Sequence, residues 1–180
     1  MKIFVMRHGQ TVWNARGITQ GISQNRLSSE GKIQAEKSAE ILKYKKIDVI
    51  VCSPLMRTVQ TANIMNKFHN AKVVKNEKII EVNQGIFTGR IFKTLTEEER
   101  FIKSQRLKSV GMESIEEVLF RVHNFIEELK NNYAEKSILV VTHNLVAGAI
   151  EAVSKNEKFD EKTFRENFNF KNAEIKELEI

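Results

Sequence analysis

The stretch Ile3-Phe4-Val5-Met6-Arg7-His8-Gly9 near the start of the sequence has four apolar residues that are followed directly by an arginine, a histidine and a glycine. The same form returns twice: the apolar run 49–52 leads into a serine, and the run 138–141 leads into Thr142-His143. Short continuous runs rich in β-branched residues are typical of strands that are covered on both faces of a parallel sheet. These three stretches therefore predict the central strands of the fold.

Amphipathic stretches separate the predicted strands. Apolar residues recur at helical spacing over 55–65, and the preceding Ser53-Pro54 predicts a helix with Ser53 as its N-cap. A capping box at Ser114 precedes an apolar stripe over 115–129, which predicts a long helix. A second capping box predicts a more polar helix over about 96–107.

Strands that alternate with helices imply right-handed crossovers and a layered α/β sandwich. The tail from Lys155 onward carries four phenylalanines, and we expect these rings to pack back on the body of the protein. Residues 173–178 suit either a helix or an edge strand.

The composition indicates one domain. The chain has 180 residues, of which 41% are hydrophobic, enough for a substantial core. The single cysteine, Cys52, excludes an internal disulfide and a zinc site built from thiolates. The first apolar run is too short for a signal peptide, and no later stretch approaches a membrane span. We therefore expect a cytoplasmic protein with no membrane partner.

The net charge of +6 is a weak indication of partners. Lysines cluster at 43–46 and at 72–78, and such clusters can attract nucleic acid. Tyr44 is the one aromatic residue that interleaves with them, too few to form a platform for stacked bases, so a solvated surface is the simpler interpretation. No nucleic-acid partner is expected, whereas a small phosphorylated substrate suits a basic protein.

Polar residues follow each of the three predicted strands: Arg7-His8, Ser53 with Arg57 one turn later, and Thr142-His143. In open α/β sheets, ligands bind outside the carboxyl ends of the strands. Two arginines and two histidines at such ends would converge on one cleft. This positive pocket would need no metal, and its natural occupant is a phosphate-sized anion.

The motifs around these residues resemble those of a known family. The stretch 6–14 resembles the Arg-His-Gly signature of the histidine phosphatase superfamily, which includes the cofactor-dependent phosphoglycerate mutases. The stretches 53–62 and 140–143 resemble its second and third blocks, and Glu81 sits where the family's proton donor lies. The resemblance implies a phosphoglycerate mutase-like fold, a three-layer α/β/α sandwich around a mostly parallel sheet.

The resemblance also implies a phosphohistidine mechanism. His8 would attack phosphorus and become transiently phosphorylated. Glu81 would protonate the leaving oxygen and then, as a carboxylate, deprotonate the water that attacks phosphohistidine. The groups expected to hold the phosphoryl oxygens are Arg7, Asn14, Gln20, Arg57 and His143. Arg7, Arg57 and His143 also count as catalytic residues in this mechanism. The resemblance implies that the protein needs no cofactor and no metal.

The sequence is interpreted as a single domain, 1–180, in which about 82–112 form a short cap over the active site. A mutase must keep water out, hold a bisphosphate and grip the carboxylate of its substrate, and the mutases that the chain resembles have an extended insertion after the position of Glu81. The resemblance, with so short a cap, therefore favours a phosphomonoesterase of the histidine acid phosphatase type. Mutase-type phosphoryl transfer stays as the alternative, and a non-catalytic phosphate-binding module as an alternative of another class. Three basic residues of the cap could contact a second anionic group: Arg90, Lys93 and Arg106.

Overall fold

The computed structural model describes residues 1–180 and is built around one five-stranded sheet. Its strands, in the spatial order β3-β2-β4-β1-β5, pair in parallel except that β5 runs antiparallel to β1. The strands are β1 (Lys2–Arg7), β2 (Val49–Cys52), β3 (Lys72–Lys75), β4 (Ile138–Thr142) and β5 (Ile175–Glu179). The predicted mostly parallel sheet is confirmed.

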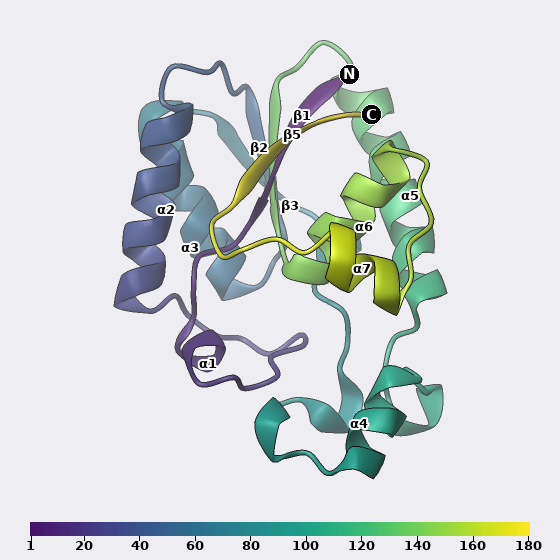
Figure 1. Ribbon diagram of the computed structural model, residues 1–180. Helices are drawn as coiled ribbons and strands as arrows, with labels where there is room; N and C mark the ends of the chain where they lie inside the picture. Colours follow the sequence, from purple (N-terminus) through teal and green to yellow (C-terminus); the bar gives the residue numbers. More distant parts are fainter.

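Helices cover both faces of the sheet. Figure 1 shows α2 and α3 on one side and α5, α6 and α7 on the other, which is the expected three-layer arrangement. The helices are α1 (Val12–Ala15), α2 (Ser29–Leu42), α3 (Met56–Met65), α4 (Glu97–Ser104), α5 (Ile115–Tyr133), α6 (Asn144–Ser154) and α7 (Glu161–Asn167). None of them combines the length and the apolar character that a membrane-spanning segment requires.

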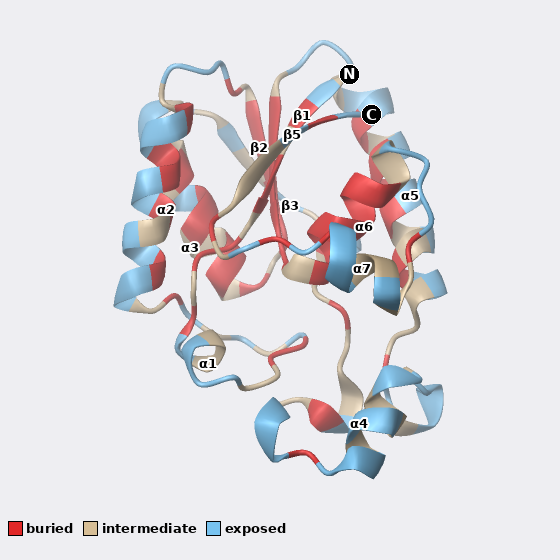
Figure 2. Cartoon of the chain, viewed as in Figure 1, coloured by how far each residue is buried: buried red, intermediate tan, exposed pale blue.

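The strands feed two separate cores because successive side chains of a strand point to opposite faces. In β1, Ile3 and Val5 belong to the larger cluster, which includes residues of α5 and α6. Met6, on the other face of the same strand, belongs to the cluster formed with α2 and α3. Both faces of the central strands are therefore buried, as Figure 2 shows, and this burial explains their unbroken apolar runs.

Two predicted helix boundaries are wrong. The helix expected from Ser53 begins at Met56, and its N-cap, Leu55, makes no side-chain cap bond. The Ser53 hydroxyl instead lies 2.8 Å from Nε2 of His143. The polar helix opens at Thr96 with the predicted capping box, but it ends at Ser104. A left-handed residue, Arg106 at φ 46°, follows this end and turns the chain away.

The tail packs back on the body as expected. Phe159, Phe168 and Phe170 are buried in the larger core cluster. For residues 173–178, the sequence left a helix and an edge strand as alternatives. The structure has an edge strand, β5, which pairs with β1. Hydrogen bonds between Met1 and Ile180 then bring the two ends of the described chain together.

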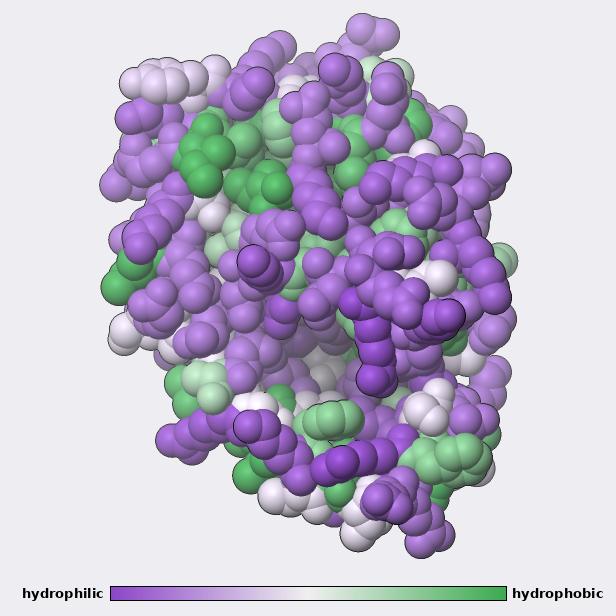
Figure 3. Space-filling model, viewed as in Figure 1, coloured by the Kyte–Doolittle hydropathy of each residue, from purple (hydrophilic) through white to green (hydrophobic).

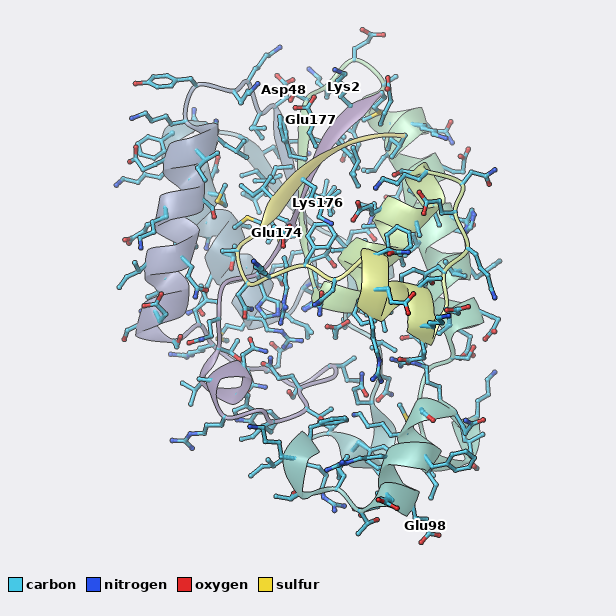
Figure 4. The ribbon with its side chains drawn as sticks, in the orientation of Figure 1. Lys2, Asp48, Glu98, Glu174, Lys176 and Glu177 are labelled. Carbon is cyan, nitrogen blue, oxygen red and sulfur yellow. The ribbon has the colours of Figure 1, made fainter.

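The 82–112 segment contains α4 and three short 3₁₀ turns at Gly85–Phe87, Phe92–Thr94 and Lys108–Val110. It has a small core of its own, made of Phe87, Leu95 and Met112. Figure 1 shows this segment beyond the carboxyl ends of the parallel strands, and Figure 3 shows the surface hollowed between it and the body. In Figure 4, Glu98 points outward from the 82–112 segment, at the end of the molecule opposite Lys2 and Glu177.

Two glycines join the loop after β1 to the start of α2. A Cβ at Gly31 would lie 1.9 Å from the Gln10 carbonyl oxygen, and a Cβ at Gly9 would lie 2.3 Å from the Gly31 carbonyl oxygen. Both contacts are with backbone atoms, which cannot rotate away as a flexible side chain can. The loop that follows His8 is therefore held directly against the helix.

We expect Gly31→Ala to lower the free energy of unfolding by about 1–3 kcal/mol, because the methyl group must displace backbone. Without a clash, glycine to alanine within a helix stabilises by roughly 0.5–1 kcal/mol. Urea denaturation measures the difference, and Lys32→Ala, at the exposed neighbouring position, is the matched control. A stabilised Gly31→Ala protein would contradict the close contact.

Candidate active site

The site residues meet because β2, β4 and β1 are neighbours in the sheet and run in parallel. Their carboxyl ends lie at one edge, where the backbone N–H of His8 donates to the Thr142 carbonyl at 2.9 Å. The His8 and His143 rings lie with their centroids 5.3 Å apart and their planes at 66°. The sequence-based expectation that these strand ends face one another agrees with this geometry.

His8 is buried, and its ring has a defined polarity. Nδ1 lies 2.7 Å from the Gly9 carbonyl oxygen, which can only accept, so Nδ1 carries the hydrogen. Burial lowers the pKa of His8 well below its usual value, and the charges of Arg57 and Arg7 lower it further. The ring is therefore neutral at neutral pH, and Nε2 carries a free lone pair.

His143 is buried beside it. Burial, then the charges of Arg57 and the neighbouring groups, lower the pKa of His143 well below its usual value. Nε2 lies 2.8 Å from the Ser53 hydroxyl, while Nδ1 is buried without a hydrogen-bond partner. If the hydroxyl donates to Nε2, the neutral ring carries its hydrogen on Nδ1, which then becomes a buried donor in need of an acceptor.

The two arginines are anchored on one side and unpaired on the other. Arg57 is fully buried and donates to the carbonyls of Ser23 at 2.7 Å and Gly21 at 2.8 Å. Arg7 donates to the Phe170 carbonyl at 2.5 Å. The Nε atoms of both arginines are buried and have no partner. Burial lowers the pKa of Arg57 to about 10, against the opposing charge of Glu81, so Arg57 stays charged at neutral pH. Burial also lowers the pKa of Arg7, and the charges of Glu81 and Glu174 oppose that fall.

Glu81 follows the short turn Glu77–Ile79 that comes after β3. The Thr142 hydroxyl donates to the Ile79 carbonyl at 2.8 Å, which ties this segment to the end of β4. Glu81 Oε1 accepts from the Val82 N–H at 3.0 Å. Burial raises the pKa of Glu81, and the Val82 N–H and the charges of Arg57 and Arg7 oppose that rise. The carboxyl group is thus held near the arginines and biased towards its protonated form.

Asn14 and Gln20 are joined through Thr11. The Thr11 hydroxyl donates to Gln20 Oε1 at 2.9 Å, and the Thr11 N–H donates to Asn14 Oδ1 at 3.1 Å. Asn172 Nδ2 lies 3.4 Å from the same Asn14 oxygen. Their carbonyl oxygens are therefore occupied, whereas the amide nitrogens of Asn14 and Gln20 make no hydrogen bond and remain available as donors.

The three basic residues of the 82–112 segment have different surroundings. Arg90 pairs with Glu99 at 2.8 Å, and Lys93 is exposed. Arg106 lies in a pocket between α4 and α7, where Nε pairs with Glu161. Of the three, only Arg106 lines this pocket.

Two groups near the site were missed as site residues by the sequence interpretation. Ser53 was counted among the polar residues that follow the predicted strands, but its side chain was assigned to a helix cap and its contact with His143 was not anticipated. Asn172 donates to the His8 carbonyl at 3.2 Å from the far end of the chain, and no local pattern signals this contact. Nowhere in the structure do three His, Cys, Asp or Glu side chains gather in a way that could hold a metal ion.

The fold and the gathered side chains define an α/β protein with a buried cationic site at the carboxyl edge of its sheet. The chain matches the histidine phosphatase superfamily (branch 1) over residues 3–180 and belongs to this family. It is 32% identical over 151 residues to Phosphoserine phosphatase 1 of Hydrogenobacter thermophilus, covering 81% of this chain and 72% of that protein. It is 31% identical over 156 residues to "Probable phosphoglycerate mutase GpmB" of Yersinia enterocolitica, covering 83% and 73%.

Solved structures share the fold. The alpha-ribazole phosphatase from Shigella flexneri superposes with a TM-score of 0.87 at 22% identity, covering 100% of this chain and 91% of that one. Bacillus stearothermophilus YhfR superposes with a TM-score of 0.89 at 18% identity, covering 99% and 91%. The expected family and the expected fold are both confirmed.

Proposed function

We propose that this protein is a phosphomonoesterase that hydrolyses a small phosphorylated substrate through a phosphohistidine on His8. The observation that carries the proposal is the set of buried nitrogens without partners on Arg7, Arg57 and His143, next to a neutral His8 ring. Buried polar atoms are almost always paired in folded proteins. A tetrahedral phosphoryl group offers the acceptors and the negative charge that this set lacks.

In the first step, the lone pair on His8 Nε2 attacks phosphorus in line with the ester bond. The P–N bond forms while the P–O bond to the leaving group breaks, and Glu81 transfers its proton to the departing oxygen. Arg7, Arg57 and His143 stabilise the nonbridging oxygens through this loose transition state. The raised pKa of Glu81 favours the protonated form that this step needs.

In the second step, Glu81 is a carboxylate and accepts a proton from water as the water oxygen attacks phosphorus. The P–N bond breaks, its electron pair returns to Nε2, and inorganic phosphate leaves. Glu81 is again protonated and His8 neutral, so the cycle closes. The Gly9 carbonyl holds the Nδ1 hydrogen throughout and can support the positive charge on the phosphorylated ring.

The alternative is transfer of the phosphoryl group back to an organic acceptor, as in a mutase. The 31% identity to a relative named as a mutase favours keeping this alternative. We propose that the 82–112 segment is a short cap over the site, and a cap of this size favours access of water. A non-catalytic phosphate-binding module is the third hypothesis. It is disfavoured because His8 and Glu81 are both present beside the arginines.

Release of inorganic phosphate tests the proposal. Purified protein is incubated with 4-nitrophenyl phosphate, and nitrophenol and phosphate are measured together with and without an added alcohol acceptor. A phosphomonoesterase releases both products in equal amounts. If the added alcohol makes nitrophenol exceed phosphate because most phosphoryl groups pass to the alcohol, the mutase alternative is supported. Binding without turnover would support the non-catalytic module.

We expect activity to survive removal of metal ions. Arg7, Arg57 and His143 supply the donors and the positive charge that a metal ion would otherwise provide to the transferring group. The rate with 4-nitrophenyl phosphate should be unchanged after dialysis against a chelator and unchanged on adding back Mg²⁺, Mn²⁺ or Zn²⁺. A rate that falls with the chelator and is restored by one of these ions would contradict this mechanism.

A further inference from the structure

A second cationic pocket lies between α4 and α7, with a volume of about 530 Å³. Four basic side chains line it, Arg100, Lys103, Arg106 and Arg165, against one acidic side chain, Glu161. Figure 3 shows the surface hollowed in this region, between the body and the 82–112 segment. The excess of positive charge indicates an anionic ligand.

Lys103 bonds to two segments that also carry candidate site residues. Its Nζ donates to Gln84 Oε1 at 2.9 Å and lies 3.3 Å from the Thr19 hydroxyl. Gln84 is three residues after Glu81, and Thr19 directly precedes Gln20. Both partners are neutral, so the ammonium group has no counter-ion among its hydrogen-bond partners. Burial and the charge of Arg106 lower the pKa of Lys103 to about 8, and Glu161 opposes this fall.

Arg106 is the second anchor. Its side chain is only 10% exposed, and it lies in the pocket lining with Nε paired to Glu161. Its Nη1 is buried and has no hydrogen-bond partner. Glu161 is shared with Arg165 at 3.6 Å, so one carboxylate serves two guanidinium groups. A buried guanidinium nitrogen without an acceptor, beside a lysine without a counter-ion, is incomplete until an anion enters.

We propose that this pocket is a subsite for a second anionic group of the substrate, a carboxylate or a second phosphate, held by Lys103 and Arg106. The subsite rests on the proposed function, because it assumes that the scissile phosphoryl group occupies the site at His8. It assigns the substrate class as phosphomonoesters with a negative charge at the end remote from the ester. Arg100 and Arg165 add charge at the rim of the same pocket.

The test compares alkyl phosphates of increasing chain length whose far end carries a carboxylate, a phosphate or a neutral amide. At the best chain length, kcat/KM should be at least about tenfold higher for one of the charged ends than for the amide, the gain typical of a hydrogen bond to a charged group. The carboxylate and phosphate arms then distinguish the two kinds of anion. Equal kcat/KM values for charged and amide ends would overturn the subsite.

Substitutions in and outside the pocket show which side chains cause the preference for a charged end. Lys103→Gln and Arg106→Gln should each reduce the preference for the charged end over the amide about tenfold. Lys93→Gln removes one charge from the same segment but lies outside the pocket lining, so it should leave that preference unchanged. An equal loss in all three variants would mean long-range attraction only, and the subsite would be wrong.

A binding arm separates the subsite from the proposed function. Non-hydrolysable phosphonates with carboxylate and amide ends are titrated calorimetrically into the wild-type protein and into Lys103→Gln. If no phosphate ester is hydrolysed but the carboxylate still binds more tightly, with the difference lost in Lys103→Gln, the subsite holds and the proposed function fails. Turnover of 4-nitrophenyl phosphate with no preference in either arm gives the opposite result.

Discussion

Replacing His8 with alanine should abolish the phosphoenzyme and lower kcat by about 10⁴-fold or more, since the change removes the proposed nucleophile. Rapid quenching after mixing with labelled substrate should yield, in the wild-type protein, a phosphoprotein that is labile in acid and stable in base. No such species should form in His8→Ala. The neutral ring and its free Nε2 lone pair, described above, are the physical basis for this expectation.

A second histidine variant controls for the label. His123 is on α5, outside the candidate site, and its Nδ1 bonds to the Leu119 carbonyl of its own helix at 2.8 Å. His123→Ala should form the phosphoenzyme at the wild-type rate. Thermal melting of both variants checks that they are folded. Label that persists undiminished in a folded His8→Ala protein would assign the nucleophile to another residue.

Glu81→Gln should slow phosphorylation by an alkyl phosphate about 10²–10⁴-fold and phosphorylation by 4-nitrophenyl phosphate by less than about tenfold. An alkoxide leaves poorly without a proton, whereas nitrophenolate departs unaided. Glutamine keeps the size of the side chain and can still accept from the Val82 N–H. The comparison uses single-turnover rates, because in the proposed mechanism Glu81 also serves the hydrolysis of phosphohistidine.

The pH dependence of the same step gives an independent readout. Burial raises the pKa of Glu81, so its proton is retained to higher pH than in an ordinary carboxyl group and is lost as the pH rises through the raised value. Phosphorylation by the alkyl ester should therefore decline on the alkaline side in the wild-type protein. In Glu81→Gln that decline should be absent, since no proton remains to be lost.

Glu113→Gln is the matched control for this carboxyl group. Both oxygens of Glu113 accept from Arg121, at 2.7 and 3.1 Å, so its carboxylate is already engaged. The variant should change the two substrates by the same factor. If Glu81→Gln also slows both substrates equally, Glu81 positions the substrate and another group supplies the proton.

The central part of the fold and site could be predicted because it depends on local patterns. The apolar runs that end at Arg7 and at Thr142 are readable as strands, and the topology of a parallel sheet then brings their ends together. The edge strands of the sheet were harder to predict from the sequence. β3 has a lysine at each end, and three of the five residues of β5 are charged, so neither has the buried run that marks a central strand.

Contacts between distant segments could not be predicted from the sequence. The position of Ser53 predicts a helix cap, but its hydroxyl instead contacts His143, and tertiary packing decides between the two roles. Likewise, Arg106 and Lys103 face α7 only because the tail folds back beside the 82–112 segment. Their spacing carries no signal of a pocket, because three of its ten lining residues, Glu161, Phe164 and Arg165, come from a segment about 60 positions away.

The edge strand at the end of the chain has a consequence for synthesis on the ribosome. The Phe170 carbonyl accepts from Arg7, Asn172 donates to the His8 carbonyl, and the β5 pairing holds β1 along its outer edge. The first strand of the sheet is made early but acquires these partners only after the last has been translated. A nascent chain that stops before residue 170 therefore lacks the contacts that orient Arg7 and His8. The proposed catalytic competence should therefore appear only once the residues through β5 have left the ribosome, rather than grow gradually as the polypeptide lengthens.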